Sequence, residues 1–542
     1  MKKLLSSLLC LSMLVALTAC GGSSSSDGTT LNMAKGGNIE VMDPAIVDDS
    51  ITSNVIKQMY DPLYDLDSDG NPVAVVATDL PEISDDGLTY TIYLNEDYTW
   101  SDGEPLTADD FIYAWKRAAA MGTGTAYYSQ FINKIKNGGT GEALDSIDDL
   151  EDFGAVALDD YTIQITLEEK CAYFTSLLTS QVFFPVRQDI VETYCDDLES
   201  TWANEVNTPV NGAFYASSIA SEDEVILTKN ENYLYADEVT LETISLKVMT
   251  DASSQTSAFQ SGEVDFADTI NLETVNTDEE LQECLYAIDP FVCNYYILVN
   301  AGDENTREEL LDEDIRAAIS YAINREEILT ASGKGDYAYE LNNLVPVGIP
   351  DASGTDYTTN NGNNFSGGYD LEKAQEIMES KGYSEDNMLT LTYSYNDTTM
   401  HKDVAQALQA SLKEAYINLE LEVAELQTFF ANRDAGDFEL ARHAMTADFL
   451  DPMAYLSMYY GSSTAGNTVD DEYYESLIDE AEALDGEERY DKLAEAEEYL
   501  VSMHYVIPLF GYTDPFLKAS NLEGITSDPA GGYDLTRAYF TD

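Results

Sequence analysis

Hydrophobic and polar positions alternate strictly in two short stretches of the chain. In residues 88–94 and again in residues 161–167, every second residue is apolar or aromatic. The residues on the two apolar faces are Leu88, Tyr90, Ile92, Leu94, Tyr161, Ile163, Ile165 and Leu167. Because an extended chain turns alternate side chains to opposite faces, each stretch is predicted to be a β-strand with one buried face.

Other segments repeat apolar residues at the spacing of a helix. Thr107 and Asp110 form a capping-box-like start for one of them, and Gly382 suits the position just after another. The predicted helices cover residues 107–119, 314–329, 371–382 and 490–501. Their inward stripes are Phe111, Trp115, Ala118 and Ala119; Ile315, Ala318, Ile319, Ala322 and Ile323; and Leu493, Ala494, Ala496 and Leu500. Interleaved helices and strands predict mixed α/β layers, and the Gly/Asn-rich residues 354–368 are expected to form one long loop.

The N-terminal segment determines the expected compartment. Two lysines precede a mostly apolar run of 16 residues from Leu4 to Ala19, which is shorter than the ~20 residues that cross a bilayer. The ending Leu-Thr-Ala-Cys resembles the bacterial lipobox, in which the cysteine is acylated. We therefore expect residues 1–19 to be a lipoprotein signal peptide and residues 20–30 a Gly/Ser tether. The mature protein would be extracytoplasmic and anchored to the bacterial cell membrane through lipid on Cys20.

The charge of the chain excludes whole classes of partner. Among 542 residues, 101 are Asp or Glu and only 26 are Lys or Arg, which gives a formal net charge of −75. Binding to nucleic acid requires dense basic residues that displace counterions, so no nucleic-acid partner is expected. A protein held electrostatically on an anionic membrane is excluded for the same reason. With 44% hydrophobic residues the chain is nevertheless expected to fold.

The sequence displays no catalytic motif. None of the three histidines lies in an H-E-x-x-H arrangement, and the Walker A and G-x-S-x-G patterns are absent. We therefore expect no enzyme activity and no cofactor. Asp65, Asp67 and Asp69 have the spacing of a calcium loop, but its twelfth position is Val76 where a bidentate Glu should stand. This is a weak metal candidate, and a tight turn is the alternative interpretation.

Four cysteines remain after Cys10 and Cys20 are set aside: Cys171, Cys195, Cys284 and Cys293. Their spacings match no zinc pattern. Outside the membrane, Cys171–Cys195 and Cys284–Cys293 are plausible disulfides, while buried free thiols are an equally good interpretation.

One long block carries a family resemblance. Residues 84–117 read SDDGLTYTIYLNEDYTWSDGEPLTADDFIYAWKR, and they resemble the signature block of the oligopeptide/dipeptide-binding lipoproteins of ABC importers, which form extracellular solute-binding protein family 5. Further segments follow in family order: Asp43-Pro44, YDPLY (60–64), NGAFY (211–215), SGEVD (261–265), DIRAAISYAINREEI (314–328) and TADFLDPMAYL (446–456). The resemblance covers essentially all of residues 31–542 and is closest to the oligopeptide-binding branch.

The resemblance implies a two-lobed, periplasmic-binding-protein-like α/β fold with an additional third domain, of the large cluster C type. Domain I would join residues 31–60, 187–291 and 512–542. Domain II, the extra domain, would cover residues 61–186, and domain III residues 292–511.

The resemblance also implies ligand-binding residues. Asp448 matches the family aspartate that pairs with a peptide's α-ammonium group, and Arg442 matches a cation that meets the C-terminal carboxylate. This pairing suits a zwitterion, because a planar guanidinium binds a carboxylate bidentately. His401 matches a second residue on the carboxylate side, while Asp48 and Tyr127 match an acidic and an aromatic residue of the cleft. In other interpretations, Arg442 neutralises a neighbouring carboxylate and His401 simply starts a helix.

Three positions depart from the family pattern. Leu426 and Met445 stand where relatives carry Trp in side-chain pockets, so residue preference is expected to differ. Cys293 matches a family cysteine whose disulfide partner is here Thr446, which leaves Cys284 as the other candidate partner.

The resemblance implies that the protein captures extended oligopeptides in a cleft between the lobes and delivers them to permease subunits that work with cytoplasmic ATPases. A monomer is expected. Alternatives are a same-fold receptor for a dipeptide, a nickel chelate, haem or an oligosaccharide, a peptide sensor that serves no importer, and a surface-anchored hydrolase.

Overall fold

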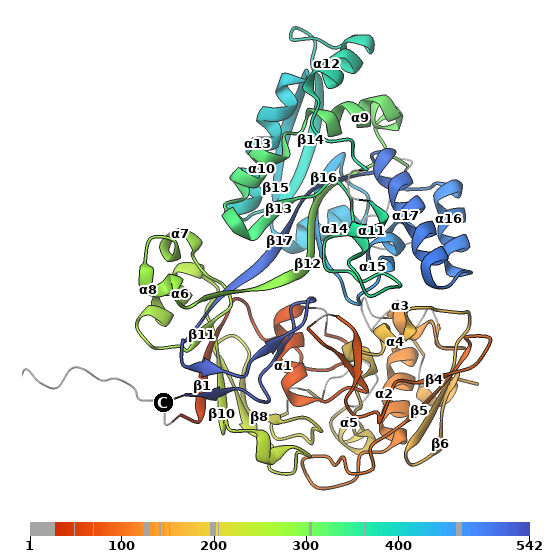
Figure 1. Cartoon of the computed structure of the whole chain (residues 1–542), viewed down its shortest axis with the longest axis vertical. Coiled ribbons are helices and arrows are strands. Elements are labelled where there is room, and N and C mark those ends of the chain that lie inside the picture. The colour runs from red at the N-terminus through yellow and green to blue at the C-terminus, as the bar shows by residue number, and fades with distance from the viewer. Residues whose placement is uncertain are drawn as a thin grey trace, which may run out of the picture.

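The computed structural model describes residues 28–541 except 48, 69, 123–128, 140–142, 145, 151, 196–201, 204, 303–305, 363–364 and 462–468. The chain forms two lobes, one below the other in Figure 1. Two long strands, β12 (Leu285–Val299) and β17 (Val506–Lys518), run from the lower lobe into the upper lobe. Helices and strands occur in both lobes, which confirms the predicted mixed α/β class.

The large sheet passes through both lobes. Within the described residues its 11 strands follow the order β15-β14-β16-β12-β17-β11-β1-β10-β9-β8, with β13 also paired to β17. The upper-lobe strands are β13 (Ala338–Glu340), β14 (Leu389–Asn396), β15 (Ile417–Ala424) and β16 (Leu440–Thr446). The lower-lobe strands are β1 (Thr30–Lys35), β8 (Phe214–Ala220), β9 (Glu224–Lys229), β10 (Thr243–Val248) and β11 (Phe266–Ala267).

A smaller sheet in the lower lobe has the order β4-β5-β7-β6 and contains both strands predicted from strict alternation. Its strands are β4 (Glu82–Ile83), β5 (Thr89–Tyr93), β6 (Ala155–Asp159) and β7 (Thr162–Thr166). Tyr90 and Ile92 of β5 are buried, as are Ile163 and Ile165 of β7, so the predicted faces are confirmed. Three short ribbons are β2–β3 (Tyr64–Leu66, Pro72–Ala74), β18–β21 (Leu522–Glu523, Tyr539–Phe540) and β19–β20 (Thr526–Ser527, Tyr533–Asp534).

Helices cover both lobes. The first eight belong to the lower lobe and its flank: α1 (Ser50–Met59), α2 (Ala108–Met121), α3 (Ser129–Ile132), α4 (Phe174–Leu177), α5 (Gln188–Tyr194), α6 (Ala252–Gln260), α7 (Leu272–Val275) and α8 (Glu279–Gln282). The upper lobe has α9 (Glu313–Ala322), α10 (Arg325–Ser332), α11 (Tyr357–Asn361), α12 (Leu371–Ser380), α13 (Thr399–Glu414), α14 (Leu426–Asp434), α15 (Met453–Leu456), α16 (Glu472–Glu482) and α17 (Gly486–Ser502). Among the described residues, no helix has the length and apolar character needed to cross a membrane.

The prediction of one helix over residues 314–329 is wrong, because the segment forms α9 and α10. Ile323 has extended backbone, and the side chain of Asn324 accepts a hydrogen bond from the backbone N–H of Glu327. This cap satisfies an N–H at the start of α10 and so favours a new helix over continuation of the old one. The apolar stripe is still buried, from Ile315 to Ile323.

Residues 354–368 are not wholly a loop as predicted. They contain α11, whose cap Asp356 accepts from the N–H of Thr359 and whose first residue, Tyr357, is fully buried. The other helix predictions are confirmed with shifted ends. The carboxylate of Asp110 accepts from the N–H of Thr107 at the start of α2 (2.9 Å), and Gly382 follows α12 with φ of 92°.

Neither plausible disulfide is formed: Cys171 is not bonded to Cys195, nor Cys284 to Cys293. The alternative interpretation of buried thiols is confirmed for Cys171 and Cys293. Cys293 lies directly opposite Thr446 in the β12–β16 ladder, so a bridge between these two positions would need a cysteine in place of Thr446. Burial raises the pKa of the Cys293 thiol to about 11, and the thiol is therefore protonated at neutral pH.

A buried ion pair joins the N-terminal segment to the lower-lobe helix α2. The guanidinium of Arg117 donates to both carboxylate oxygens of Asp43, at 3.0 and 2.7 Å, and the two side chains are 1% and 0% exposed. Both residues lie in segments that carry the family resemblance. The pair is bidentate, which offsets part of the cost of removing two charges from water.

We expect Arg117→Met to lower the free energy of unfolding by about 3–5 kcal/mol, because it leaves the buried carboxylate of Asp43 without its partner. Guanidinium unfolding followed by circular dichroism measures this loss. Arg537→Met is the matched control, since the Arg537–Glu238 pair is 57% and 50% exposed and its loss should cost less than about 1 kcal/mol. Equal losses in the two variants would contradict the prediction.

Candidate functional site

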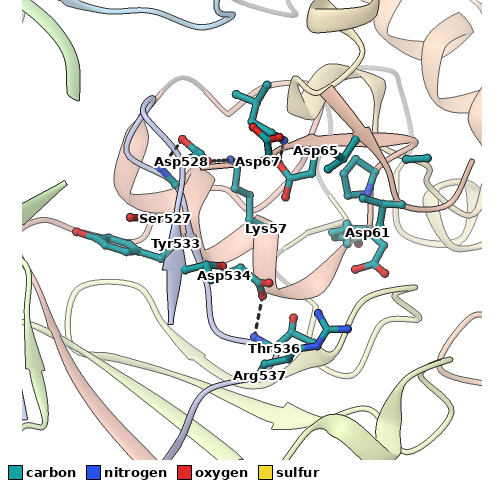
Figure 2. Close-up of a pocket in the computed structure, with 18 of the residues that line it drawn as sticks. Lys57, Asp61, Asp65, Asp67, Ser527, Asp528, Tyr533, Asp534, Thr536 and Arg537 are labelled. Atoms are coloured by element: carbon teal, nitrogen blue, oxygen red, sulfur yellow. Dashed lines mark hydrogen bonds and ion pairs between the residues drawn. The ribbon is translucent and has the colours of Figure 1, made fainter. Parts of the chain in front are cut away.

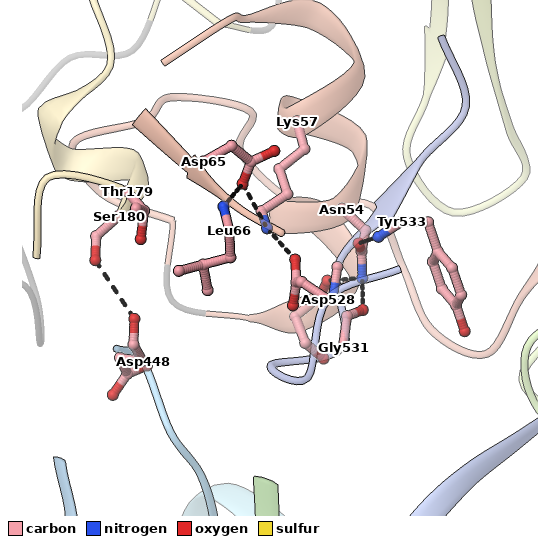
Figure 3. Close-up of polar contacts among 12 residues, drawn as sticks. Asn54, Lys57, Asp65, Leu66, Thr179, Ser180, Asp448, Asp528, Gly531 and Tyr533 are labelled. Carbon is pink, nitrogen blue, oxygen red and sulfur yellow. Dashed lines mark hydrogen bonds and ion pairs between the residues drawn. The ribbon is translucent and has the colours of Figure 1, made fainter. Parts of the chain in front are cut away.

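A cavity of about 470 Å³ opens between the lobes. The lower lobe contributes α1, residues 179–181 and residues 530–533, and the upper lobe contributes Thr446, Ala447 and Asp448. Phe291 and Asp514, from the strands that connect the lobes, complete its wall. Figure 3 shows Asp448 facing Ser180, whose hydroxyl donates to the backbone oxygen of Asp448 at 3.5 Å. The two lobes therefore meet at the predicted ammonium-binding residue.

The loop that carries Asp448 is held from two sides. On the upper-lobe side, the guanidinium of Arg489 in α17 donates to both oxygens of Asp451, each at 2.8 Å, and the two side chains are only 2% and 3% exposed. On the lower-lobe side, the ring of Phe449 stacks on Tyr173 with centroids 5.0 Å apart. These contacts, one to each lobe, fix the segment that directly follows the half-buried Asp448.

Arg442 is buried on β16, six residues before Asp448. Its side chain is 7% exposed, its Nε donates to Oδ1 of Asn396 at 2.7 Å, and its guanidinium lies 5.2 Å from the ring centre of Phe429. In the described part of the chain it forms no ion pair with a carboxylate. The structure therefore gives no support to the interpretation that Arg442 neutralises a neighbouring carboxylate. Burial lowers the pKa of the Arg442 guanidinium.

His401 lies near Arg442 through Tyr295. The hydroxyl of Tyr295 is 3.2 Å from Nδ1 of His401, and the imidazole is also buried. Burial and the positive charge of Arg442 together lower the pKa of His401 to about 3, so the ring is neutral at physiological pH. His401 also belongs to the first turn of α13, as its N–H donates to the hydroxyl of Thr398.

Of the predicted ligand residues that the structure describes, Asp448 lines this cavity. Arg442, His401, Met445 and Leu426 do not line it, and the other predicted residues cannot be placed. Met445 is 8% exposed and donates its N–H to Oδ1 of Asn294, and Leu426 begins α14 with 40% of its surface exposed. Asp48, Tyr127 and the predicted lipidation site Cys20 lie outside the described residues.

The weak calcium candidate forms the turn between β2 and β3. Asp67 accepts from the N–H of Asn71 at 2.8 Å, and Gly70 has φ of 82°, which is the left-handed backbone that the tight-turn interpretation predicts. A carboxylate oxygen of Asp65 lies 3.9 Å from Nζ of Lys57 (Figure 3), so the positive charge beside Asp65 is that of a lysine side chain. Asp69 lies outside the described residues. Among the residues that the structure describes, no cluster of three or more His, Cys, Asp or Glu side chains is arranged to hold a metal ion.

A second cavity, of about 440 Å³, lies within the lower lobe beside the first. Figure 2 shows Lys57 there close to Asp528, and their charged atoms are 2.7 Å apart. Lys57 lines both cavities. Asp61, on the same wall, accepts from the hydroxyls of Tyr98 (2.8 Å) and Tyr233 (3.0 Å), and burial raises its pKa to about 7.

Sequence reasoning singled out only Asp448 among the charged residues of the cleft, and it missed Lys35, Asp268 and Asp514 among others. These three come from β1, from the end of β11 and from β17, which the fold brings together from distant parts of the chain. No local motif marks any of them, so a folded structure was needed to find them.

The profile of the bacterial extracellular solute-binding proteins, family 5 Middle, matches residues 71–467. The oligopeptide-binding protein OppA of Bacillus subtilis is 26% identical over 564 residues, covering 97% of this chain and 97% of that protein. The dipeptide-binding protein DppE of Bacillus subtilis is 27% identical over 504 residues, covering 91% of this chain and 88% of that protein. The solved structure of Listeria monocytogenes OppA bound to peptide matches with a TM-score of 0.76 at 26% identity, and covers 95% of this chain and 100% of that one.

The raised pKa of Asp61 predicts a dependence of stability on pH. An aspartate in the unfolded chain titrates near pH 4, whereas in the folded state burial raises the pKa of Asp61 to about 7. Between these values the folded state holds the proton and the unfolded state does not, so stability falls as the pH rises from 4 to 7. The midpoint temperature of the native protein minus that of Asp61→Asn should therefore be smaller at pH 8 than at pH 5. A constant difference would contradict the prediction.

Proposed function

The chain belongs to family 5 of the bacterial extracellular solute-binding proteins, and from this membership and the geometry of the cleft we propose that it captures oligopeptides between its lobes and delivers them to an ABC importer. The relatives OppA and DppE are peptide-binding proteins by name, and the Listeria structure holds a peptide. We take their ligand class as the ligand class of this chain.

One observation carries the proposal. An anionic residue, Asp448, lies where the lobes meet, and a buried cation without an ion-pair partner among the described residues, Arg442, lies six positions earlier on the same segment. A buried guanidinium without a counter-ion is costly, and a ligand carboxylate would remove that cost. Six residues of extended chain span at most about 20 Å, so the peptide that fits between the two groups has at most about six residues.

The bound peptide would lie extended between the lobes. Its α-ammonium group would pair with Asp448 and its carboxylate with Arg442, with neutral His401 available as a further hydrogen-bonding group on the carboxylate side. Backbone hydrogen bonds of the added-strand type do not discriminate between side chains, and hydrated pockets tolerate different residues. We propose that Asp48, Tyr127, Met445 and Leu426 contribute to the walls of the closed cleft.

Contacts from both lobes would favour the closed state, so that binding shifts an opening–closing equilibrium. The permease would recognise the closed form. We propose the domain division predicted from the resemblance, with domain I at 31–60, 187–291 and 512–542, domain II at 61–186 and domain III at 292–511. We also propose a monomer anchored through acylated Cys20, since two acyl chains suffice for stable attachment to a membrane.

A dipeptide receptor is the second candidate, because the dipeptide-binding relative is as similar as the oligopeptide-binding one. The span between Asp448 and Arg442 favours a longer ligand. A nickel chelate, haem or an oligosaccharide would make no use of a fixed anion and a fixed cation at opposite ends. A hydrolase would need a nucleophile and a base within reach of each other.

We expect Asp448→Asn to weaken binding of a free tripeptide to pentapeptide by about tenfold to a hundredfold, since it removes a charge-assisted contact with the α-ammonium group. Isothermal titration calorimetry with alanine peptides of three to five residues measures the change. Against the same peptide with an acetylated N-terminus, the variant and the native protein should bind equally. Asp386→Asn, an exposed aspartate of the upper lobe, is the control for lost charge.

We expect Arg442→Gln to show the complementary pattern. It should weaken a peptide with a free carboxylate by a similar factor and leave the binding of the C-terminal amide unchanged, because only the carboxylate needs the guanidinium. The same titration distinguishes the two ends. If either variant weakens both forms of its peptide to the same extent, the assignment of that end is wrong.

A further inference from the structure

The charged residues that line the cleft cavity are mostly neutralised within the protein. Lys35 lies 2.8 Å from Asp268, and Lys57 lies 2.7 Å from Asp528. Asp49 caps α1 by accepting from the N–H of Thr52 at 2.7 Å. The other two carboxylates of the wall are Asp448, where the lobes meet, and Asp514.

Asp514 has no such neutralising contact. Its half-buried side chain forms no hydrogen bond or ion pair with any residue that the structure describes, although Lys334 and Lys35 are near enough to attract it and Asp268 near enough to repel it. Burial consequently raises its pKa to about 6, against the attraction of the two lysines. A carboxylate in this state gains from a cation that approaches it directly.

A second polar group of the same cavity is also without a partner. The hydroxyl of Tyr533 is buried, the residue is 5% exposed, and no hydrogen bond to a described residue reaches it. Asp514 is the carboxylate that most strongly affects this hydroxyl, and it acts together with burial to raise the pKa of Tyr533. A buried hydroxyl is normally paired, so this one indicates a missing donor or acceptor. Gly531 and Tyr533 both line the cavity, and Figure 3 shows the two residues near Asn54.

The register of the large sheet places Asp514 relative to the ammonium-binding end. Cys293 of β12 pairs with Thr446 on one side and with Tyr512 on the other, so β16 and β17 run in the same direction. Asp448 lies two residues beyond Thr446, just after β16 ends, and Asp514 lies two residues beyond Tyr512, within β17. At this level β16 and β17 lie on either side of β12, two strand spacings or about 10 Å apart, and this sets the approximate separation of the two carboxylates. The head of a Lys or Arg side chain near the N-terminus of an extended peptide lies at a comparable distance from the α-ammonium group.

We propose that Asp514 and the hydroxyl of Tyr533 form a subsite for the cationic side chain of a Lys or Arg at the first or second position of the peptide. The subsite rests on the proposed peptide-binding function and adds a specificity to it. Asp448 binds the free N-terminus, whereas Asp514 selects a cationic side chain at the first or second position. The ammonium or guanidinium would donate to the carboxylate of Asp514 and to the oxygen of Tyr533.

The test compares peptides that differ only in one charge. Alanine tetrapeptides with Lys or its uncharged analogue norleucine at position one, two or three are titrated calorimetrically into the full-length mature protein. We expect Lys at position one or two to bind about tenfold more tightly than norleucine. Asp514→Asn should reduce this ratio to about one and change the affinity for the norleucine peptide by less than about twofold.

Two variants separate a direct contact from the general effect of charge. Asp336→Asn removes an exposed carboxylate near Lys334 in sequence and should leave the ratio at about tenfold. Tyr533→Phe should lower the ratio a few-fold, because the hydroxyl is lost and the carboxylate remains. An unchanged ratio in Tyr533→Phe would remove the hydroxyl from the subsite.

The outcomes also separate this proposal from the proposed function. If norleucine peptides bind and the Lys preference is absent, appears only at position three, or survives in Asp514→Asn, the subsite is wrong while peptide binding stands. If no peptide of any sequence binds the native protein, the proposed function fails and the subsite fails with it. Circular dichroism of Asp514→Asn establishes that a lost preference does not reflect a lost fold.

Discussion

Antiparallel pairing of β12 with β17 is the interaction on which the arrangement of the lobes depends, because these strands pass from one lobe into the other (Figure 1). The ladder is irregular between the pairs Ile288–Asp514 and Cys293–Tyr512, where one strand advances five residues and the other two. Beyond this irregularity, Cys293 also fixes Thr446 and with it the segment that ends in Asp448. The same few residues therefore set the relation of the lobes and the position of both cleft carboxylates.

Buried charge is treated in two different ways in this molecule. Arg117 and Arg489 are held bidentately by Asp43 and Asp451, and these pairs lie deep inside the lobes or behind the Asp448 loop. Arg442 and Asp514 are buried or half-buried without an ion pair in the described structure. The structural charges are thus paired within the protein, whereas these two are not. A ligand that carries both a positive and a negative group would therefore gain electrostatic free energy by pairing with them.

Local features of the sequence predicted local structure well. Alternation identified β5 and β7, and Thr107 with Asp110 marked the start of α2, because these signals depend on neighbours in the chain. The break between α9 and α10 was missed, since an apolar stripe continues across it and only the cap at Asn324 interrupts the backbone. The family resemblance indicated Asp448 and Arg442. Asp514 could not be found this way, because its place in the cleft depends on the pairing of β17 with β12 and of β12 with β16.

Both ends of the described chain belong to the lower lobe, where β1 starts at Thr30 and β21 ends at Phe540. The upper lobe is reached only by way of β12 and left by way of β17. If the protein is attached to the membrane near its N-terminus, as proposed, the lower lobe is the fixed body and the upper lobe moves relative to it. Ligand capture would then move the upper lobe relative to the membrane. A transport partner could detect the change in the height and tilt of this lobe without touching the ligand.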